Sequence, residues 1–225
     1  MQIHLGWYPK ISSIQSMDRV VHTGHSKRKV MYMEKGTITL VRVTKEATHE
    51  QTVLRSLLKM YCYEWSQYNH LEVDADGTYA FEEHASTYWT NEGYYAFLIA
   101  VDEQWAGFVF FDTHDFIVHT DCDYSMAEFF VMHAYRHRGI GSYVATYLFE
   151  TFGGAWEIGR HPKNLSSVHF WDKVVGDYTG GDYEVRLSCP KLKYHDGALG
   201  DVLSFHADKH ERFLPYQGSR VCRRS

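Results

Sequence analysis

Apolar residues recur along the chain with two periods, and the period separates the expected strands from the expected helices. Runs of alternating or continuous apolar residues, rich in β-branched and aromatic side chains, predict strands. Such runs lie at 37–43, 93–101, 105–111, 124–132, 155–159 and 182–188. Apolar residues three and four positions apart predict helices that cover 54–65, 81–89, 140–152 and 166–175. This order of elements is typical of one mixed sheet with helices on both faces.

Local signals set the expected boundaries of the core domain. Thr48 and Gln51 fit a capping box, which predicts the start of the first helix. Residues 1–36 are polar, basic and unpatterned, so we expect an N-terminal extension, in part disordered, that lies outside the core. The polar and basic residues 206–225 form an expected C-terminal tail. The folded domain is therefore expected at 37–205.

Composition and charge narrow the class of protein. The chain has 225 residues, of which 44% are hydrophobic, enough to bury a substantial core. A formal net charge of −5 argues against a general nucleic-acid binder. No apolar run is long enough to cross a bilayer, and the N-terminus lacks the pattern of a secretion signal. We therefore expect a cytoplasmic protein with no nucleic-acid or membrane partner.

Cysteine and histidine spacing gives no sign of a metal site. The four cysteines include no C-x-x-C pair. The histidine pairs that come closest to a metal motif, His133 with His137 and His114 with His119, have neither the helical context nor the added acidic residue of a metal hydrolase. We expect no bound metal. The sequence does not fix the oligomeric state, and a homodimer is compatible with it.

The segment YRHRGIG, at 135–141, carries the strongest chemical signal. It joins an expected strand directly to an expected helix, and the first turn of a helix has backbone N–H groups without intrahelical partners. Gly139 and Gly141 would let an anion approach the backbone, and Arg136 and Arg138 could bond its oxygens. The segment matches neither the P-loop nor the full G-x-G-x-x-G pattern. A glycine-punctuated helix start without a ligand is the alternative.

Two motifs in this region together resemble one family. The R-x-x-G-x-G arrangement of Arg136, Gly139 and Gly141 resembles the acetyl-CoA motif of the GNAT N-acetyltransferase superfamily. The segment NLSSVHFW at 164–171 resembles that superfamily's N-x-x-A-x-x-[FL]-[YW] helix, with Ser167 where alanine is usual. The resemblance covers about residues 37–188. It implies an α/β fold with a mixed, mostly antiparallel sheet of about six to seven strands, and acetyl-CoA as cofactor with CoA as product.

The resemblance also implies which residues bind the cofactor. The strand at 124–132 precedes the segment 135–141, here called the corner, and would splay from the next strand, at 155–159, to admit the pantetheine arm. The backbone at Phe130, Val131 and Met132 would bond that arm and the acetyl carbonyl, and a backbone N–H near Val131 or Met132 would stabilise the oxyanion. The residues implied around the pyrophosphate, or against the rest of CoA, are Arg136, His137, Arg138, Gly139, Ile140, Gly141, Ser142, Asn164 and Trp171.

Glu128 is the candidate general base. It lies among apolar residues in the expected strand 124–132, where partial burial would raise its pKa towards a useful value. A structural hydrogen bond, or binding of a substrate ammonium without proton transfer, are the alternatives. Many family members have tyrosine where this chain has Trp171, and an indole is not an acid near neutral pH. Tyr178 and Tyr183 lie downstream as other donors, or water could protonate the thiolate.

The acceptor is expected to bind between 65–79 and 112–125, two acidic segments that also carry aromatic residues. The acids that could form a negative rim for a polyamine or aminoglycoside are Glu72, Asp74, Asp115, Asp121 and Asp123. Solvated loop acids without that role are the alternative. The expected function is transfer of the acetyl group of acetyl-CoA directly to a small primary amine. A protein N-terminus or lysine as acceptor, and a non-catalytic acyl-CoA-binding module, remain open.

Overall fold

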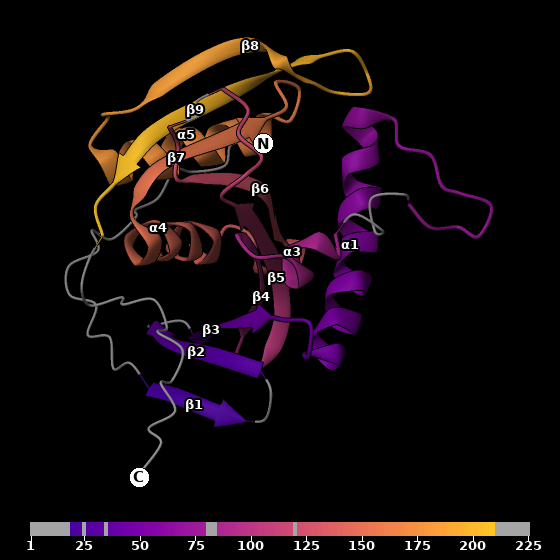
Figure 1. The fold of residues 1–225 in the computed structure, drawn as a ribbon, viewed down its shortest axis with the longest axis vertical. Helices are drawn as coiled ribbons and strands as arrows, with labels where there is room; N and C mark the ends of the chain where they lie inside the picture. Colours follow the sequence, from indigo (N-terminus) through magenta and orange to yellow (C-terminus); the bar gives the residue numbers. More distant parts are fainter. Residues whose placement is uncertain (1–18, 24–25, 34–35, 80–84, 119–120, 210–225) are drawn as a thin grey trace, which may run out of the picture.

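One twisted sheet with helices on both faces organises the molecule (Figure 1). The computed structural model describes residues 19–23, 26–33, 36–79, 85–118 and 121–209. Within them the sheet has nine strands in the order β1-β2-β3-β4-β5-β6-β7-β9-β8, and every neighbouring pair is antiparallel except β6 and β7. The strands are β1 (Arg19–Thr23), β2 (Ser26–Met33), β3 (Gly36–Val43), β4 (Tyr94–Val101), β5 (Gln104–Asp112), β6 (Tyr124–Val131), β7 (Gly154–Arg160), β8 (Glu184–Lys193) and β9 (Leu199–Ala207).

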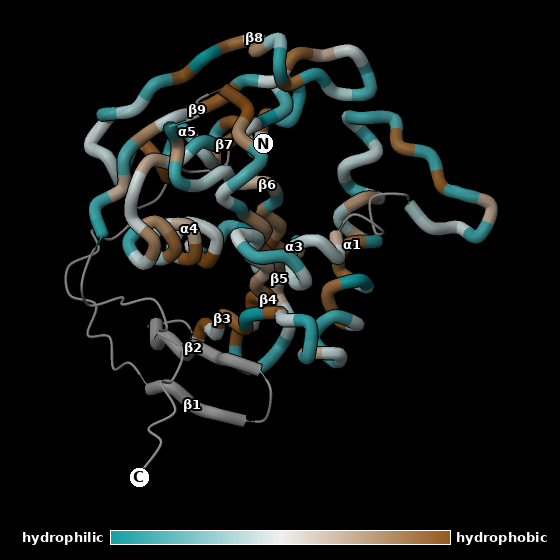
Figure 2. Tube along the Cα trace, in the orientation of Figure 1, coloured by the Kyte–Doolittle hydropathy of each residue, from teal (hydrophilic) through white to brown (hydrophobic). Residues whose placement is uncertain are grey.

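Two hydrophobic clusters fix the helices to opposite faces of this sheet. The first helix α1 (Thr48–Asn69) and the short α3 (Thr87–Thr90) cover one face, with Leu54, Leu58 and Trp89 packed against β4 and β5. Helices α4 (Ile140–Phe152) and α5 (Leu165–Thr179) cover the other. Figure 2 shows apolar residues gathered along the central strands and on the sides of the helices that face them. No described helix is long and apolar enough to cross a bilayer.

The expected mixed, mostly antiparallel sheet with helices on both faces is confirmed, although the strand count was low. The seven strands from β3 to β9 lie in or at the edge of the expected domain 37–205. Strand β9 was missed, because Asp201, Ser204 and His206 interrupt its apolar pattern. Strands β1 and β2 lie in the segment expected to be an extension, and they continue the sheet beyond β3. A domain boundary at residue 36 stays a prediction, and residues 1–18 and 210–225 lie outside the described residues.

Two helix predictions need correction. Thr48 is the first residue of α1 rather than its N-cap, so the predicted capping box does not form. The Gln51 side chain instead donates to the Thr44 carbonyl, at 2.7 Å. The helix expected at 81–89 is described only as α3, since residues 80–84 lie outside the described part of the chain.

Candidate active site

A β-bulge aims the Glu128 side chain at the α1 face. In the ladder between β5 and β6, Phe110 pairs with Glu128 but Phe111 pairs with Met126, so Ala127 is an extra residue. Met126 packs in the cluster under α4 and α5. Without the extra residue, Glu128 would share that face, because side chains two positions apart point the same way. The bulge therefore moves the carboxylate to the opposite face, where Phe130 also packs.

A tyrosine from α1 holds this carboxylate. Tyr61 donates a hydrogen bond from its hydroxyl to Glu128 Oε2. Burial raises the pKa of Glu128 to about 7, and the bond from Tyr61 offsets part of that rise because it favours the charged form. Burial and the nearby carboxylate raise the pKa of Tyr61 well above its ordinary value, so Tyr61 stays a donor. Glu128 is therefore divided between acid and carboxylate near neutral pH, as a general base requires.

Aromatic rings continue from Tyr61 along α1. Trp65, one turn later, stacks on Tyr61 with ring centroids 6.3 Å apart. Tyr194, from the turn between β8 and β9, meets Trp65 edge-to-face at 5.7 Å. That turn is tied to the end of α1, because the backbone N–H of His195 donates to Asn69 Oδ1 at 2.7 Å. The β8–β9 turn thus closes one end of the space between α1 and the sheet.

The parallel ladder between β6 and β7 ends early, which leaves backbone groups of β6 unpaired. Its register covers only three pairs, from Tyr124–Trp156 to Met126–Ile158. Beyond it, Met132 N–H donates to Ala106 O on the β5 side, at 2.8 Å. Alternate residues of a strand bond to alternate sides, so Phe129 and Val131 direct their N–H groups towards the β7 side. Of the predicted backbone donors, the Val131 N–H therefore faces the splay, which is the gap where β6 and β7 diverge. The N–H groups of Phe130 and Met132 point to β5.

The corner after β6 presents unpaired amides, as the sequence predicted. The first intrahelical bond of α4 comes from Tyr143 N–H to the Gly139 carbonyl. The six N–H groups from His137 to Ser142 make no hydrogen bond within the described chain. Gly139 has φ +80, and a Cβ placed on it would meet nothing within 4 Å. The space beside Gly139 is thus open, which suits close approach of an anion.

The other predicted corner residues have structural partners. A Cβ on Gly141 would lie 3.1 Å from the Phe170 ring, so this glycine lets α5 pack against α4. Arg136 donates from Nε to the Val131 carbonyl at 2.6 Å and from a terminal nitrogen to Glu64 at 2.8 Å. The exposed Arg138 lies over the Tyr135 ring at 5.7 Å. A phosphate contact for Arg136 or Arg138 stays a prediction.

The residues at the start of α5 and along it that were predicted to take part in the reaction make contacts within the protein. Asn164 is the N-cap of α5, and its Oδ1 accepts a bond from Ser167 N–H at 3.1 Å. Trp171 is 4% exposed and packs edge-to-face on Phe129, at 5.2 Å, so it has the packing role that the sequence allowed. Tyr178 donates towards the Asp208 carbonyl at the far end of α5. Cofactor contacts of Asn164 and Trp171 stay predictions.

Three acids of the predicted rim, Glu72, Asp74 and Asp123, lie on segments that do not carry Glu128. Glu72 and Asp74 are exposed on the loop after α1, which projects away from the sheet (Figure 1). Asp123 lies where β6 begins, at the end opposite the corner, and its carboxylate accepts a bond from Ala155 N–H at 2.8 Å. A substrate role for these three residues stays a prediction.

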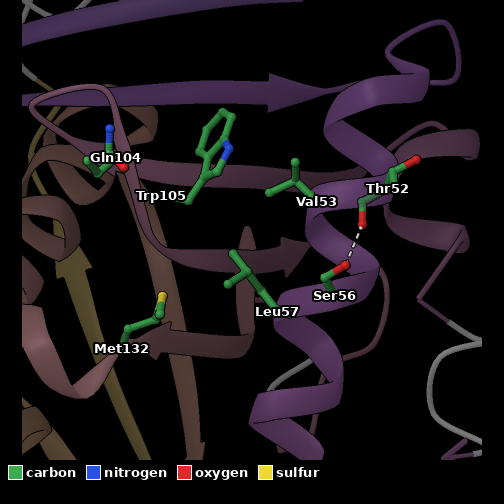
Figure 3. Close-up of a pocket in the computed structure, with 7 residues that line it drawn as sticks. All are labelled: Thr52, Val53, Ser56, Leu57, Gln104, Trp105 and Met132. Carbon is green, nitrogen blue, oxygen red and sulfur yellow. Dashed lines mark hydrogen bonds between the residues drawn. The ribbon is translucent and has the colours of Figure 1, made fainter.

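A cavity of about 380 Å³ lies between α1 and the sheet (Figure 3). It is bounded by the first half of α1, the start of β5 and the residue that follows β6. The side chains that line it are Thr52, Val53, Ser56, Leu57, Gln104, Trp105 and Met132. Leu57 stands one helical turn before Tyr61, so the cavity adjoins the space in front of Glu128 without including the carboxylate.

A comparison with family models decides the class of this site. The model of the Acetyltransferase (GNAT) family matches residues 57–176, which run from α1 through the corner into α5 and include Glu128. The chain belongs to the GNAT acetyltransferase family. The match covers more than half of the chain, and the resemblance predicted from the two motifs is confirmed. No curated protein matches this GNAT chain.

Solved acetyltransferase structures are similar to this GNAT chain at low sequence identity. An acetyltransferase from Thermus thermophilus is 10% identical, with a TM-score of 0.53 over 77% of this chain and 99% of that chain. The protein yncA from Salmonella typhimurium, solved with its cofactor acetyl-CoA, is 15% identical with a TM-score of 0.48, over 77% and 96%. An aminoglycoside 6'-N-acetyltransferase from Enterococcus faecium is 14% identical with a TM-score of 0.45, over 80% and 99%.

GNAT membership makes this protein an acetyltransferase with acetyl-CoA as its cofactor, and the residues of the site fit that molecule. A diphosphate needs several converging N–H groups and room to approach them, and the corner offers both beside Gly139. A pantetheine arm needs a strand edge without a partner, and β6 has one beyond Met126. When bound, acetyl-CoA supplies the acetyl thioester.

Sequence reasoning missed the side chains that complete the site. Tyr61 and Trp65 were assigned only to the apolar face of a helix, although their i, i+4 spacing placed them together. Phe129 was not among the backbone donors, because the pairing of β6 with β5 decides which amides are free. Tyr194 was outside every predicted element, since the β8–β9 hairpin that carries it was not recognised.

Proposed function

We propose that this protein transfers the acetyl group of acetyl-CoA to the nitrogen of a small primary amine, with Glu128 as the general base. The observation that carries the proposal is the placement of Glu128, turned to the α1 face by the bulge at Ala127 and held there by Tyr61. An alkyl ammonium has a pKa of about 10 and must lose a proton before its nitrogen can attack. A carboxylate with a pKa near 7 can accept that proton at neutral pH.

The corner and the free edge of β6 would hold the coenzyme. The N–H groups from His137 to Ser142 would bond the diphosphate, and Gly139 would leave room for it. The N–H of Val131 would bond the acetyl carbonyl and stabilise the negative charge that develops on its oxygen. These roles put the thioester at the splay between β6 and β7, next to the strand that carries Glu128.

The β8–β9 turn, at one end of the space between α1 and the sheet, favours a small acceptor over a protein. The β8–β9 turn reaches α1 through the bond from His195 to Asn69 and the contact of Tyr194 with Trp65. An extended peptide crossing the site would have to displace this turn. Polyamines and aminoglycosides are small acceptors too, but three of the acids expected to attract them, Glu72, Asp74 and Asp123, lie on the loop after α1 and just before β6.

A thiol-release assay with acetyl-CoA and a panel of amines tests the proposal. The panel should contain monoamines, polyamines, aminoglycosides, amino acids and peptides, with the acetylated product identified by mass spectrometry. We expect at least one small amine to be acetylated, and Glu128→Gln to lower kcat by about 10²–10⁴. Glu184→Gln is the matched control, because Glu184 is exposed on the edge strand β8. Equal activity of the two variants would remove Glu128 from catalysis.

A further inference from the structure

We propose that the acceptor is a primary monoamine with an aromatic or other apolar body, which lies against an aromatic wall formed by Tyr61, Trp65 and Tyr194. This inference rests on the proposed function, since it describes the other half of the same reaction. The proposed substrate carries a single positive charge, which lies next to Glu128.

The aromatic wall is built from two distant parts of the chain. Tyr61 and Trp65 are four residues apart on α1, so they lie one above the other on the same helix face. Tyr194 comes from the β8–β9 turn and lies 5.7 Å from Trp65, between centroids. None of the three residues is fully buried. The wall begins at the Glu128 carboxylate, to which Tyr61 is bonded.

Apolar side chains also cover the α1 face of β7, across the splay. A Cβ on Gly159 would lie 2.8 Å from Ile117 Cδ1 and 3.0 Å from Leu192 Cδ2. Ile117 is held there because its backbone N–H, and that of Val118, donate to the buried Glu157 carboxylate. The absence of a side chain at Gly159 therefore lets two aliphatic groups line the side of the cleft that faces the rings.

Other carboxylates at this end of the molecule are already bonded within the chain. Glu64 is 2.8 Å from a terminal nitrogen of Arg136. Asp196 is 2.6 Å from Lys163 Nζ and also accepts a backbone N–H. Asp112 is 1% exposed and accepts two backbone N–H groups. The exposed Asp115 accepts a bond from the Tyr94 hydroxyl at 3.0 Å. A second ammonium would therefore have to share a carboxylate with a group of the chain.

A site with aromatic rings and one carboxylate is suited to an amine that has one ammonium group and an apolar body. An ammonium at Glu128 gains a charge partner and the negative face of a nearby ring. The apolar body gains burial against rings and aliphatic side chains, which is proportional to the apolar area covered. A polycation gains the first interaction but loses hydration at each further charge. The site should therefore prefer phenethylamine or isoamylamine to spermidine or kanamycin.

Steady-state kinetics on the wild type and two variants test this preference. We expect kcat/KM for phenethylamine to exceed that for spermidine by at least about tenfold. Trp65→Ala should lower kcat/KM for phenethylamine by about tenfold, mainly through KM, and leave the calorimetric Kd for CoA unchanged. Tyr63→Ala is the matched control, because Tyr63 lies on the outer face of α1 and is 75% exposed. If Trp65→Ala does not fold, Tyr194→Ala on the half-exposed turn should give the same rise in KM.

The outcomes separate this inference from the proposed function. Preference for spermidine or kanamycin, with dependence on Glu128 and no effect of Trp65→Ala or Tyr194→Ala, would overturn the monoamine proposal and leave the acetyltransferase proposal standing. Absence of acetylation for every amine tested would overturn both. A loss of CoA affinity in Trp65→Ala would assign Trp65 to coenzyme binding and overturn the wall as an acceptor site.

Discussion

Two opposing effects act on the carboxyl group of Glu128. Burial raises its pKa, a hydrogen bond from Tyr61 opposes that rise, and the resulting pKa is about 7. The sequence predicted the first effect, because an acid among apolar residues of a strand must be partly desolvated. It could not predict the second, since Tyr61 is 67 positions away and meets Glu128 only through the packing of α1 on the sheet.

Removal of the Tyr61 hydroxyl should shift the pH dependence of the reaction. Tyr61→Phe deletes a bond that favours the carboxylate, so the pKa of Glu128 should rise further above about 7. We expect the acidic limb of kcat/KM to move to higher pH by about one pH unit. Tyr63→Phe serves as the control, since its ring is exposed. An acidic limb at the same pH in both variants would show that the Tyr61 bond does not tune the base.

At the scale of elements, the passage from β6 into α4 places unpaired backbone amides beside open space. The sequence predicted a strand, the corner and a helix in this order, and it predicted that Gly139 and Gly141 would both let an anion approach. The structure separates their roles, because Gly139 faces open space whereas Gly141 allows contact with Phe170. The bulge at Ala127 was not predictable, since its sequence is an ordinary apolar run and only the register against β5 reveals it.

Gly139 offers a clean test of the corner. Gly139→Val should weaken CoA binding by at least about tenfold in calorimetry, because the new side chain fills the space beside the amides. Gly180→Val is a matched control, since Gly180 also has positive φ and open space around its Cβ position but ends α5. Both variants should lose about 1–2 kcal/mol of stability from the left-handed backbone. Similar CoA affinity in the two variants would mean that the corner does not hold the diphosphate.

At the scale of the whole molecule, the sequence predicted the central strands of the sheet better than the strands near its edges. Strands β3 to β7 follow simple apolar patterns and were all expected. Strand β9 contains Asp201, which is buried but lies 4.0 Å from Arg160 and accepts a bond from Ser188 N–H at 2.9 Å. In the sequence, a charged residue that is paired inside the fold looks like a loop residue. Strand β9 was therefore not predicted, and neither was the β8–β9 hairpin that carries Tyr194.

Truncation of the N-terminal segment tests the division between core and extension. Deletion of residues 1–33 removes β1 and β2, which lie at one edge of the sheet, with β3, β4 and β5 between them and β6. We expect a folded protein whose Kd for CoA changes by less than about twofold, because no coenzyme-binding element is touched. An insoluble product would show that β2 is needed to cover the edge of β3. A large loss of CoA affinity would contradict the assignment of the site.

The pH dependence of kcat/KM, compared between wild type and Glu128→Gln, tests the central claim most directly. The active form of Glu128 is the carboxylate, and the amine binds to it as the ammonium. Log kcat/KM of the wild type should therefore rise with unit slope up to about pH 7 and then stay level to about pH 10. Glu128→Gln should lack the break near pH 7 and follow only the ionisation of the amine. A break near pH 7 that survives in Glu128→Gln would contradict the assignment of Glu128 as the base.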